Sequence, residues 1–379
     1  MGNLFGDPGR VTNRPVSDDP APTSPSERIV SLDALRGVAV LGILVINVRA
    51  FSMPETVLLN PTVYGDFSGA NYWAWLAGHV LAEGTFITVF SALFGAGIVL
   101  FTRSKRAKGQ RAARLHYRRT LLLTAAGLAH AYLLWYGDVL VAYGICGLVL
   151  AFARDWSPRA LAAAGTALLL VAPLFEVLGA LAAESEAIAA WWEPGEAALR
   201  AEVAAYRGGW IEQLDHRVPA ALGRQTTGFL ASTFWRVGGT ILWGMALYKW
   251  GVVTGERSDR PYRLLVAGGL IGAGIVLAGV WYIEASGWSA GAAPFWRQFN
   301  YAGSLLVAGG YVGAVTLYAR RRPEGPLTRA LAAVGRTAFT NYLLQTVVAT
   351  TVFYGHGLGL FGSVSRIEEI GRASCRERV

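Results

Sequence analysis

The sequence predicts an all-α fold, a polytopic integral membrane helix bundle, and three observations support this. Hydrophobic residues make up 53% of the 379 residues and charged residues only 16%, whereas a soluble protein carries about 25% charged residues. Apolar stretches near the length of about 20 residues that a helix needs to cross a bilayer recur along the chain. Basic residues gather in short runs beside these stretches, as the positive-inside rule expects of membrane proteins.

Composition also excludes several classes of function. The net charge of +9 comes with no basic fold and no aromatic platform, so we expect no nucleic-acid partner. The two cysteines, Cys146 and Cys375, and five scattered histidines give neither a disulfide framework nor the spacing of a metal site. We therefore expect no metal and no bound cofactor. The expected partner is the lipid bilayer, and the sequence leaves the oligomeric state open.

The N-terminal part begins with residues 1–27, which are rich in proline, serine and aspartate and predict a disordered cytoplasmic arm. N-terminal membrane helices are then expected within residues 28–182, with spans at residues 32–51, 85–102, 121–135, 139–152 and 160–181. We expect a break at Glu83-Gly84 and a tight turn at residues 136–138. Residues 103–119 contain eight basic residues and no acid, which predicts a cytoplasmic loop.

Residues 183–225 differ in character because acids outnumber bases there. They predict an external amphipathic insert of two helices, with Trp191, Trp192 and Trp210 as interfacial anchors. The C-terminal membrane helices, residues 226–365, carry predicted spans at 229–250, 264–283, 301–318 and 331–354, with an external loop at 287–298. Nine spans result, every basic loop falls on one side, and the protein is expected in the cell (cytoplasmic) membrane with its N-terminus in the cytoplasm.

The last segment, residues 366–379, reads RIEEIGRASCRERV and fits neither a span nor a cap. It resembles the translation of a sequencing adapter, so we expect a non-native tail and exclude it from fold reasoning. The alternative is a native basic tail. Nine spans that end outside also suggest that a tenth is missing by truncation.

His130 is the leading candidate for a general base, because it lies in an apolar span eight residues before Asp138 at the adjoining turn. A carboxylate can orient such a histidine to take a proton from a hydroxyl or an amine. The alternatives are an interhelical hydrogen bond for His130 and an N-cap for Asp138. His79 and Glu83, four residues apart on one helix face, form a second candidate pair, for which local packing is the alternative.

Two arginines in apolar surroundings, Arg236 and Arg336, are candidates for binding an anionic group. An arginine at the centre of a span costs about 2.5 to 3.5 kcal/mol on insertion scales. Arg336 can reach the cytoplasmic surface, since its span starts only a turn earlier. Arg236 lies deeper and needs an acid or an anionic ligand facing it.

The first span carries polar groups at both ends. Asp33 and Arg36 can pair at its entrance, and Asn47 lies about 20 Å from them at 1.5 Å per residue. Near the C-terminus, Asn341 and Gln345 form a stripe with Thr337 that predicts either helix–helix contacts or a cavity wall.

Four separated motifs carry a resemblance: RIVSLDALRGVAVLGILVINV at Arg28, FSALFGAGIVLF at Phe90, HAYLLWYGDVLVAYG at His130 and GRTAFTNYLLQT at Gly335. In order and spacing they resemble the YeiB-like family of bacterial inner-membrane proteins, a domain of unknown function. That family is commonly grouped with the heparan-alpha-glucosaminide N-acetyltransferases among transmembrane acyltransferases that share the LDxxRG helix. Its members usually continue past the position of Ser365 into a further helix, which agrees with a missing span.

The resemblance implies transfer of an acyl group from a cytoplasmic acyl-CoA, such as acetyl-CoA as cosubstrate, to an acceptor at the outer face. In the lysosomal relatives an asparagine near the end of the matching helix is followed shortly by a catalytic histidine. Asn47 matches the asparagine, but no histidine follows before His79.

We therefore expect a membrane acyltransferase, with His130 as base, Asp138 orienting it, Asn47 near the acceptor and Arg236 or Arg336 binding anionic groups. The alternatives are a transporter or permease of a small molecule, and a non-catalytic membrane protein. An enzyme predicts His130, Asn47 and an arginine around one cavity on the basic side. A transporter predicts broken helices meeting at mid-membrane in repeated halves.

Overall fold

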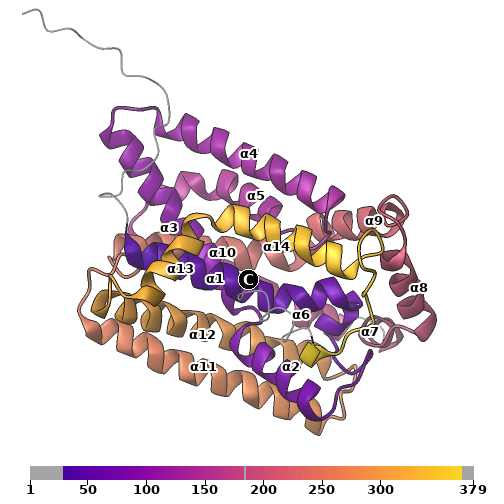
Figure 1. The fold of residues 1–379 in the computed structure, drawn as a ribbon. Coiled ribbons are helices and arrows are strands. Elements are labelled where there is room, and N and C mark those ends of the chain that lie inside the picture. Colours follow the sequence, from indigo (N-terminus) through magenta and orange to yellow (C-terminus); the bar gives the residue numbers. More distant parts are fainter. Residues whose placement is uncertain (1–28, 183–184, 369–379) are drawn as a thin grey trace, which may run out of the picture.

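The computed structural model describes residues 29–182 and 185–368, which form helices and turns and contain no strand (Figure 1). The prediction of an all-helical fold is confirmed. The predicted arm, residues 1–27, and residues 369–379 of the predicted tail lie outside the described residues. The first residue of that tail, Arg366, is buried and donates hydrogen bonds to the carbonyl oxygens of Tyr64 and Asp66.

The N-terminal helices follow the predicted order: α1 Val30–Ser52, α2 Gly69–Leu81, α3 Thr85–Ala107, α4 Ala112–Leu133, α5 Leu140–Leu150 and α6 Pro158–Ala182. Short 3₁₀ turns lie at Glu55–Leu58 and Ala151–Asp155. The break between α2 and α3 falls where the sequence placed it. Gly84 has a φ of +70°, a left-handed conformation that glycine adopts at little cost, so the chain can change direction there.

The basic run at residues 103–119 is not the loop that we predicted. The helix α3 continues to Ala107 and α4 begins at Ala112, so only four residues connect them. Arginine and lysine favour helices, and the turn forms at Gly109, which has a φ of +69°. The charges are therefore carried on two helix ends.

The insert contains three helices instead of the predicted two: α7 Ser185–Trp192, α8 Glu196–Arg207 and α9 Leu214–Gln225. Breakers separate them, a Pro-Gly pair before α8 and a Gly-Gly pair after it. Trp191 and Trp210 are exposed, as interfacial anchors require. Trp192 is fully buried, and its indole N–H donates to the carbonyl oxygen of Trp288 at 2.7 Å.

The C-terminal helices are α10 Phe234–Lys249, α11 Asp259–Ala285, α12 Ala293–Arg321, α13 Pro326–Arg336 and α14 Ala338–Phe353, with a π turn at Phe229–Thr233 before α10. The predicted loop at 287–298 is shorter, because α12 begins at Ala293. The predicted span at 331–354 is broken at Thr337. There the side-chain amide of Asn341 donates to the carbonyl oxygen of Val334 at 3.0 Å and satisfies a group freed by the break.

Glycines let the long helices pack closely along one another. A Cβ on Gly335 of α13 would lie 1.8 Å from the carbonyl oxygen of Asp33 on α1. A Cβ on Gly95 of α3 would lie 2.0 Å from the carbonyl oxygen of Ile241 on α10. Small residues at such crossings are typical of helix pairs in membranes. The α1–α13 crossing places the start of α1 beside Arg336.

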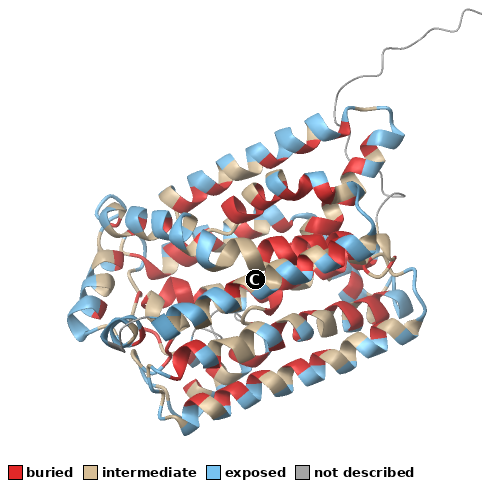
Figure 2. Cartoon of the chain, turned by 180° about the vertical axis from the view of Figure 1, so that it is seen from behind, coloured by how far each residue is buried: buried red, intermediate tan, exposed pale blue. Residues whose placement is uncertain are grey.

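Five helical segments of the described chain are long and apolar enough to cross a membrane: Val30–Ser52, Gly69–Ala107, Pro158–Ala182, Asp259–Ala285 and Ala293–Arg321. The outer faces of α6 and α11 expose large apolar side chains, among them Leu170, Leu174, Leu264, Leu270 and Trp281, while the buried residues gather inside the bundle (Figure 2). An apolar exterior of this size is compatible with lipid. The number of nine spans stays a prediction.

The basic connections gather at one end of the bundle, which we call the basic end. Arg106 near the end of α3 pairs with Asp155 before α6 at 2.8 Å. Arg320 at the end of α12 donates to the carbonyl oxygen of Arg257 before α11 at 2.6 Å. The helices α7, α8 and α9 lie at the opposite end (Figure 1). This arrangement agrees with the expectation that the basic segments share one side.

Candidate functional site

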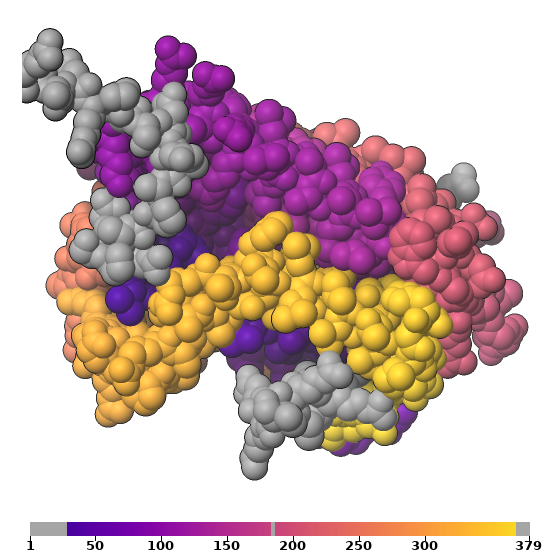
Figure 3. All heavy atoms as spheres, turned by 45° about the horizontal axis from the view of Figure 1, so that its top comes forward, coloured from indigo at the N-terminus to yellow at the C-terminus, as the bar shows by residue number. Residues whose placement is uncertain are grey.

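A cavity of about 1350 Å³ lies toward the basic end, bounded by α1, α3, α4, α5, α13 and α14. We call it the basic cavity. In Figure 3 the surface is hollowed between the purple residues of α3–α4 and the yellow residues of α14.

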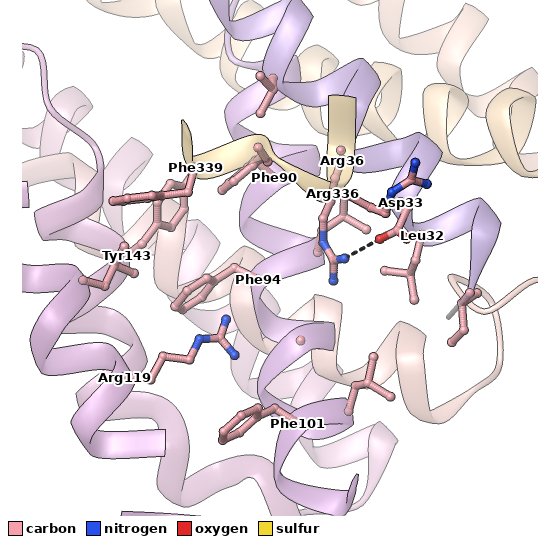
Figure 4. A pocket seen from close by; sticks show the side chains of 18 of the residues that line it. Leu32, Asp33, Arg36, Phe90, Phe94, Phe101, Arg119, Tyr143, Arg336 and Phe339 are labelled. Carbon is pink, nitrogen blue, oxygen red and sulfur yellow. Dashed lines mark hydrogen bonds and ion pairs between the residues drawn. The ribbon is translucent and has the colours of Figure 1, made fainter. Parts of the chain in front are cut away.

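Cationic side chains dominate the polar lining of the basic cavity. The lining contains one acid, Asp33, and six cationic residues, which are Arg36, Arg103, Lys105, Lys108, Arg119 and Arg336. Asp33 accepts a hydrogen bond from Arg36 at 2.8 Å, so the pairing predicted at the start of α1 is present. Figure 4 shows Arg119 across the cavity from Arg36 and Arg336. The cavity therefore carries excess positive charge.

The interior walls of the same cavity are aromatic and aliphatic. The larger apolar lining residues are Leu32, Ile43, Phe90, Phe94, Phe101, Tyr143, Phe339 and Tyr342. Phe94 and Phe101 lie on either side of Arg119 (Figure 4), and the guanidinium of Arg119 lies 5.2 Å from the centre of the Phe101 ring. Cationic groups next to an apolar interior suit a ligand with an anionic head and an apolar chain.

His130 lies behind one wall of this cavity. Its ring centroid is 5.1 Å from that of the lining residue Tyr342, and the histidine is only 2% exposed. Its Nδ1 lies 2.7 Å from a carboxylate oxygen of Asp138, and its Nε2 lies 3.0 Å from the hydroxyl of Thr346. The other oxygen of Asp138 accepts the backbone N–H of Val141 at 2.8 Å. Asp138 thus both caps α5 and orients the imidazole.

These contacts fix the hydrogen-bond pattern of the buried cluster. With Asp138 ionised, Nδ1 carries the proton and donates a hydrogen bond to the carboxylate. Nε2 is then unprotonated and can accept a hydrogen bond. In this tautomer the hydroxyl of Thr346 donates to that nitrogen at 3.0 Å, and the carbonyl oxygen of Tyr342, at 3.3 Å, is its alternative acceptor. A hydroxyl, an imidazole and a carboxylate in this order form an arrangement that can move a proton.

A second cavity of about 200 Å³ lies toward the opposite end, and we call it the polar pocket. Its lining comes from α2, α3, α6, α10 and α12 with the loops before them: Leu58, Leu59, His79, Glu83, Gly84, Ile87, Glu176, Ser232, Arg236, Trp296, Arg297, Asn300 and Tyr301. His79 Nδ1 lies 2.9 Å from the carboxylate of Glu83. The imidazole is stacked between the rings of Trp75 and Trp296, at 4.9 and 5.3 Å.

Arg236 enters the polar pocket from α10. Its Nη2 donates to the carbonyl oxygen of Gly84 at 3.0 Å, to Thr88 Oγ1 at 3.0 Å and to Ser304 Oγ at 2.8 Å. Its guanidinium also lies over the ring of Tyr301 at 4.6 Å. No carboxylate of the described residues lies within ion-pair distance of it. The carbonyl oxygen of Gly84 also accepts from the hydroxyl of Thr88 at 2.7 Å, so the threonine and the arginine share this acceptor.

The structure divides the residues singled out from the sequence between two places. At the basic cavity it brings together three lining residues and the buried pair behind the wall: Asp33, Arg36, Arg336, His130 and Asp138. At the polar pocket it brings together His79, Glu83 and Arg236. For an enzyme we expected His130, Asn47 and an arginine around one cavity. Within residues 29–182 and 185–368, neither of these two cavities is lined by all three.

Besides His130 and Asp138 behind the wall, three predicted residues line neither cavity. Asn47 is half-buried on α1. Gln345 donates to the carbonyl oxygen of Val40 at 3.4 Å, which joins α14 to α1, and Asn341 donates to Val334 at the helix break. Of the two interpretations of the polar stripe, these contacts favour helix–helix packing.

Sequence reasoning missed Arg119, Thr346 and Arg297. Arg119 was interpreted only as part of the basic run that orients the chain. It is the last residue of that run, lies inside α4 and lines the basic cavity. Thr346 ends the fourth motif, and its partner His130 starts the third, so the motifs held a signal for this contact. Nothing in the sequence marks Arg297.

The described part of the chain holds no group of three or more metal-ligating side chains. The geometry therefore offers two sites built from ordinary side chains, a large cationic cavity with an apolar interior and a small polar pocket.

Comparison with known proteins places this chain among uncharacterised relatives. The family of proteins of unknown function DUF418 matches residues 247–375. The chain is 34% identical to the uncharacterized protein YeiB of Escherichia coli (strain K12), over 90% of this chain and 87% of that protein. It is 31% identical to the uncharacterized protein YxaH of Bacillus subtilis (strain 168), over 90% and 86%. No solved structure gave a significant match. The chain therefore belongs to the YeiB-like family of DUF418 proteins.

Proposed function

We propose that this protein is a membrane acyltransferase that takes its acyl group from an acyl-CoA held in the basic cavity. The observation that carries the proposal is the lining of that cavity, six cationic side chains beside an aromatic interior, with a buried His130–Asp138 pair behind the wall. One arginine can bind two oxygens of a phosphate at the same time. The aromatic interior accepts the pantetheine arm and the acyl chain. By the positive-inside rule the basic end faces the cytoplasm, where acyl-CoA is made.

In this proposal His130 is the general base. An acceptor hydroxyl or amine attacks the thioester carbonyl carbon, and the carbon–sulfur bond breaks. Nε2 takes the proton of the acceptor and passes it to the departing CoA thiolate. For this, the hydroxyl of Thr346 turns from Nε2 to the carbonyl oxygen of Tyr342, which lies 3.3 Å away. The ring of Tyr342 also moves aside, because it separates His130 from the cavity.

The test supplies radiolabelled acetyl-CoA to the purified full chain with a panel of amines, sugars and lipids, and follows the label into an acceptor. A general base contributes about 10²–10⁴-fold, so His130→Ala should lower transfer by that factor. Donor binding should weaken in Arg336→Gln and stay unchanged in Arg329→Gln. Arg329 is exposed on the same helix, two turns from Arg336, and does not line the cavity. No transfer, or equal transfer with and without His130, contradicts the proposal.

A second candidate function is a permease for a small anion, and the helix breaks favour it. The segment Gly69–Ala107 is broken at Gly84, and the carbonyl oxygen of Gly84 holds Arg236 in the polar pocket. Broken helices beside a buried charge are typical of transporter binding sites. Uptake of labelled anions into proteoliposomes, lost in Arg236→Gln, combined with no acetyl transfer, would select this candidate.

A further inference from the structure

We infer that the polar pocket is a binding site for a small carboxylate, with Arg236, His79 and Trp296 as its hydrogen-bond donors. The inference does not rest on acyl transfer and concerns a different cavity from the proposed donor site. Its observations are three buried polar atoms without partners in the described chain, the volume of the pocket and the charges around it.

The guanidinium of Arg236 is the first donor. Its Nη2 is bound by three neutral oxygens, and no acid of the described residues pairs with it. Its Nε is buried and has no hydrogen-bond partner among the described residues. A buried cation held only by neutral groups favours an anionic ligand. The Nε–H group of Arg236 can donate a hydrogen bond to such a ligand.

The imidazole of His79 is the second donor. Glu83 engages Nδ1, and two tryptophan rings hold the imidazole plane. Nε2 is buried, and no atom of the described residues bonds to it. His79 is only 2% exposed, so bulk water does not replace the missing partner of Nε2. When the ring carries both protons, Glu83 balances its charge and Nε2–H can donate to a ligand.

Trp296 adds a third donor, because its indole N–H is buried and also has no partner in the part of the chain that the structure describes. Trp296 is 3% exposed and stacks with His79. A carboxylate has about four acceptor positions, so three donors can be satisfied by one ligand. Buried polar groups without partners are uncommon in native proteins, and here three of them line one small cavity.

The acids of the pocket are already engaged and do not repel such a ligand strongly. Glu83 is bound by His79, and Glu176 accepts from Gln298 at 2.8 Å and lies 3.6 Å from Arg297. Arg236 is therefore the cation of the pocket that no acid of the described residues pairs with, and it attracts an anion. Apolar lining residues such as Ile87 can take the carbon part of the ligand.

The volume limits the size of the ligand. A cavity of about 150 Å³ can hold benzene, and the polar pocket measures about 200 Å³. A monocarboxylate up to the size of benzoate therefore fits, whereas an acyl-CoA does not.

The experiment measures thermal unfolding and calorimetric binding of the purified full chain with benzoate, with its neutral isostere benzamide, and with inorganic phosphate. We expect saturable binding and stabilisation by benzoate, and at least tenfold weaker binding of benzamide. Trp296→Phe keeps the ring but removes one donor, so benzoate binding should weaken about three- to tenfold. Trp281→Phe, at an exposed position on α11, should bind as the wild type does. Arg236→Gln should weaken binding at least about thirtyfold.

Equal binding of benzoate and benzamide, or unchanged binding in Trp296→Phe, would overturn the inference. Saturable binding of phosphate without benzoate would also overturn it, because the ligand would then be a different anion. If Arg236→Gln does not fold, Trp296→Phe still decides the outcome. Loss of acetyl transfer in His130→Ala has no bearing on this result, so the failures of the two proposals can be told apart.

Discussion

Replacing Asp138 separates the two contacts that one carboxylate makes. In Asp138→Asn an amide oxygen can still accept the N–H of Val141, since asparagine is a good N-cap. The charged hydrogen bond to His130 becomes a neutral one, which should lower the free energy of unfolding by about 1 kcal/mol. Asp138→Ala also loses the cap, about 1 kcal/mol. In place of the neutral hydrogen bond, this variant leaves Nδ1 buried without a partner, which costs about 1–3 kcal/mol. The expected total is about 2–4 kcal/mol.

The assay compares unfolding of both variants in detergent and their acetyl transfer. We expect Asp138→Asn to be the more stable of the two and yet to lose transfer by about 10²–10⁴-fold, because its amide no longer holds the base in the right tautomer. The control is Asp155→Asn, which breaks an exposed pair with Arg106 and should change stability by under about 1 kcal/mol. Equal stability of Asp138→Asn and Asp138→Ala would refute the cap, and wild-type transfer in Asp138→Asn would refute the orienting role.

Three further predictions concern packing, pH and the buried cluster. Gly335→Ala should cost about 1–3 kcal/mol in thermal unfolding, since its Cβ meets α1, whereas Gly274→Ala, with no atom within 4 Å, should be neutral or stabilising; equal effects would contradict the close crossing. Burial raises the pKa of Glu202 from its usual 4.5 to about 7. The folded protein therefore keeps a proton that the unfolded chain releases, so stability should fall as pH rises from about 4.5 to 7, and this part of the fall should vanish in Glu202→Gln; an unchanged pH profile would count against it. Thr346→Val should destabilise by about 1–3 kcal/mol, because Nε2 of His130 loses its partner, while Thr346→Ser should not; identical melting of the two variants would show that this hydrogen bond contributes nothing.

The sequence predicted those elements of the fold that depend on local signals. The first helix and the break at Gly84 follow from apolar length and from one glycine between two apolar stretches. The break at Thr337 was missed, because no glycine or proline marks it. It is stabilised by the side chain of Asn341, which donates to the carbonyl oxygen of Val334, and this contact forms only in the folded helix pair. The basic run at residues 103–119 was missed for a related reason, since charge alone does not distinguish a loop from two helix ends.

The candidate site was predictable where its residues are close in the chain. His130 and Asp138 meet across a single turn, and His79 and Glu83 across one helical turn. Thr346 lies 216 residues from His130, and only helix packing brings them together. Packing also decides that Arg236 and Arg336 lie in different cavities, which no spacing in the sequence shows.

The most direct test of the donor site uses an acyl-CoA that carries a photoreactive group on its acyl chain, crosslinked to the purified protein and mapped by mass spectrometry. The proposal predicts labelled peptides that contain Phe90, Phe94 or Phe339, with labelling lost when unmodified acyl-CoA is added in excess. Labelling confined to the exposed apolar faces of α6 and α11, unaffected by the competitor, would contradict an acyl-CoA site in the basic cavity.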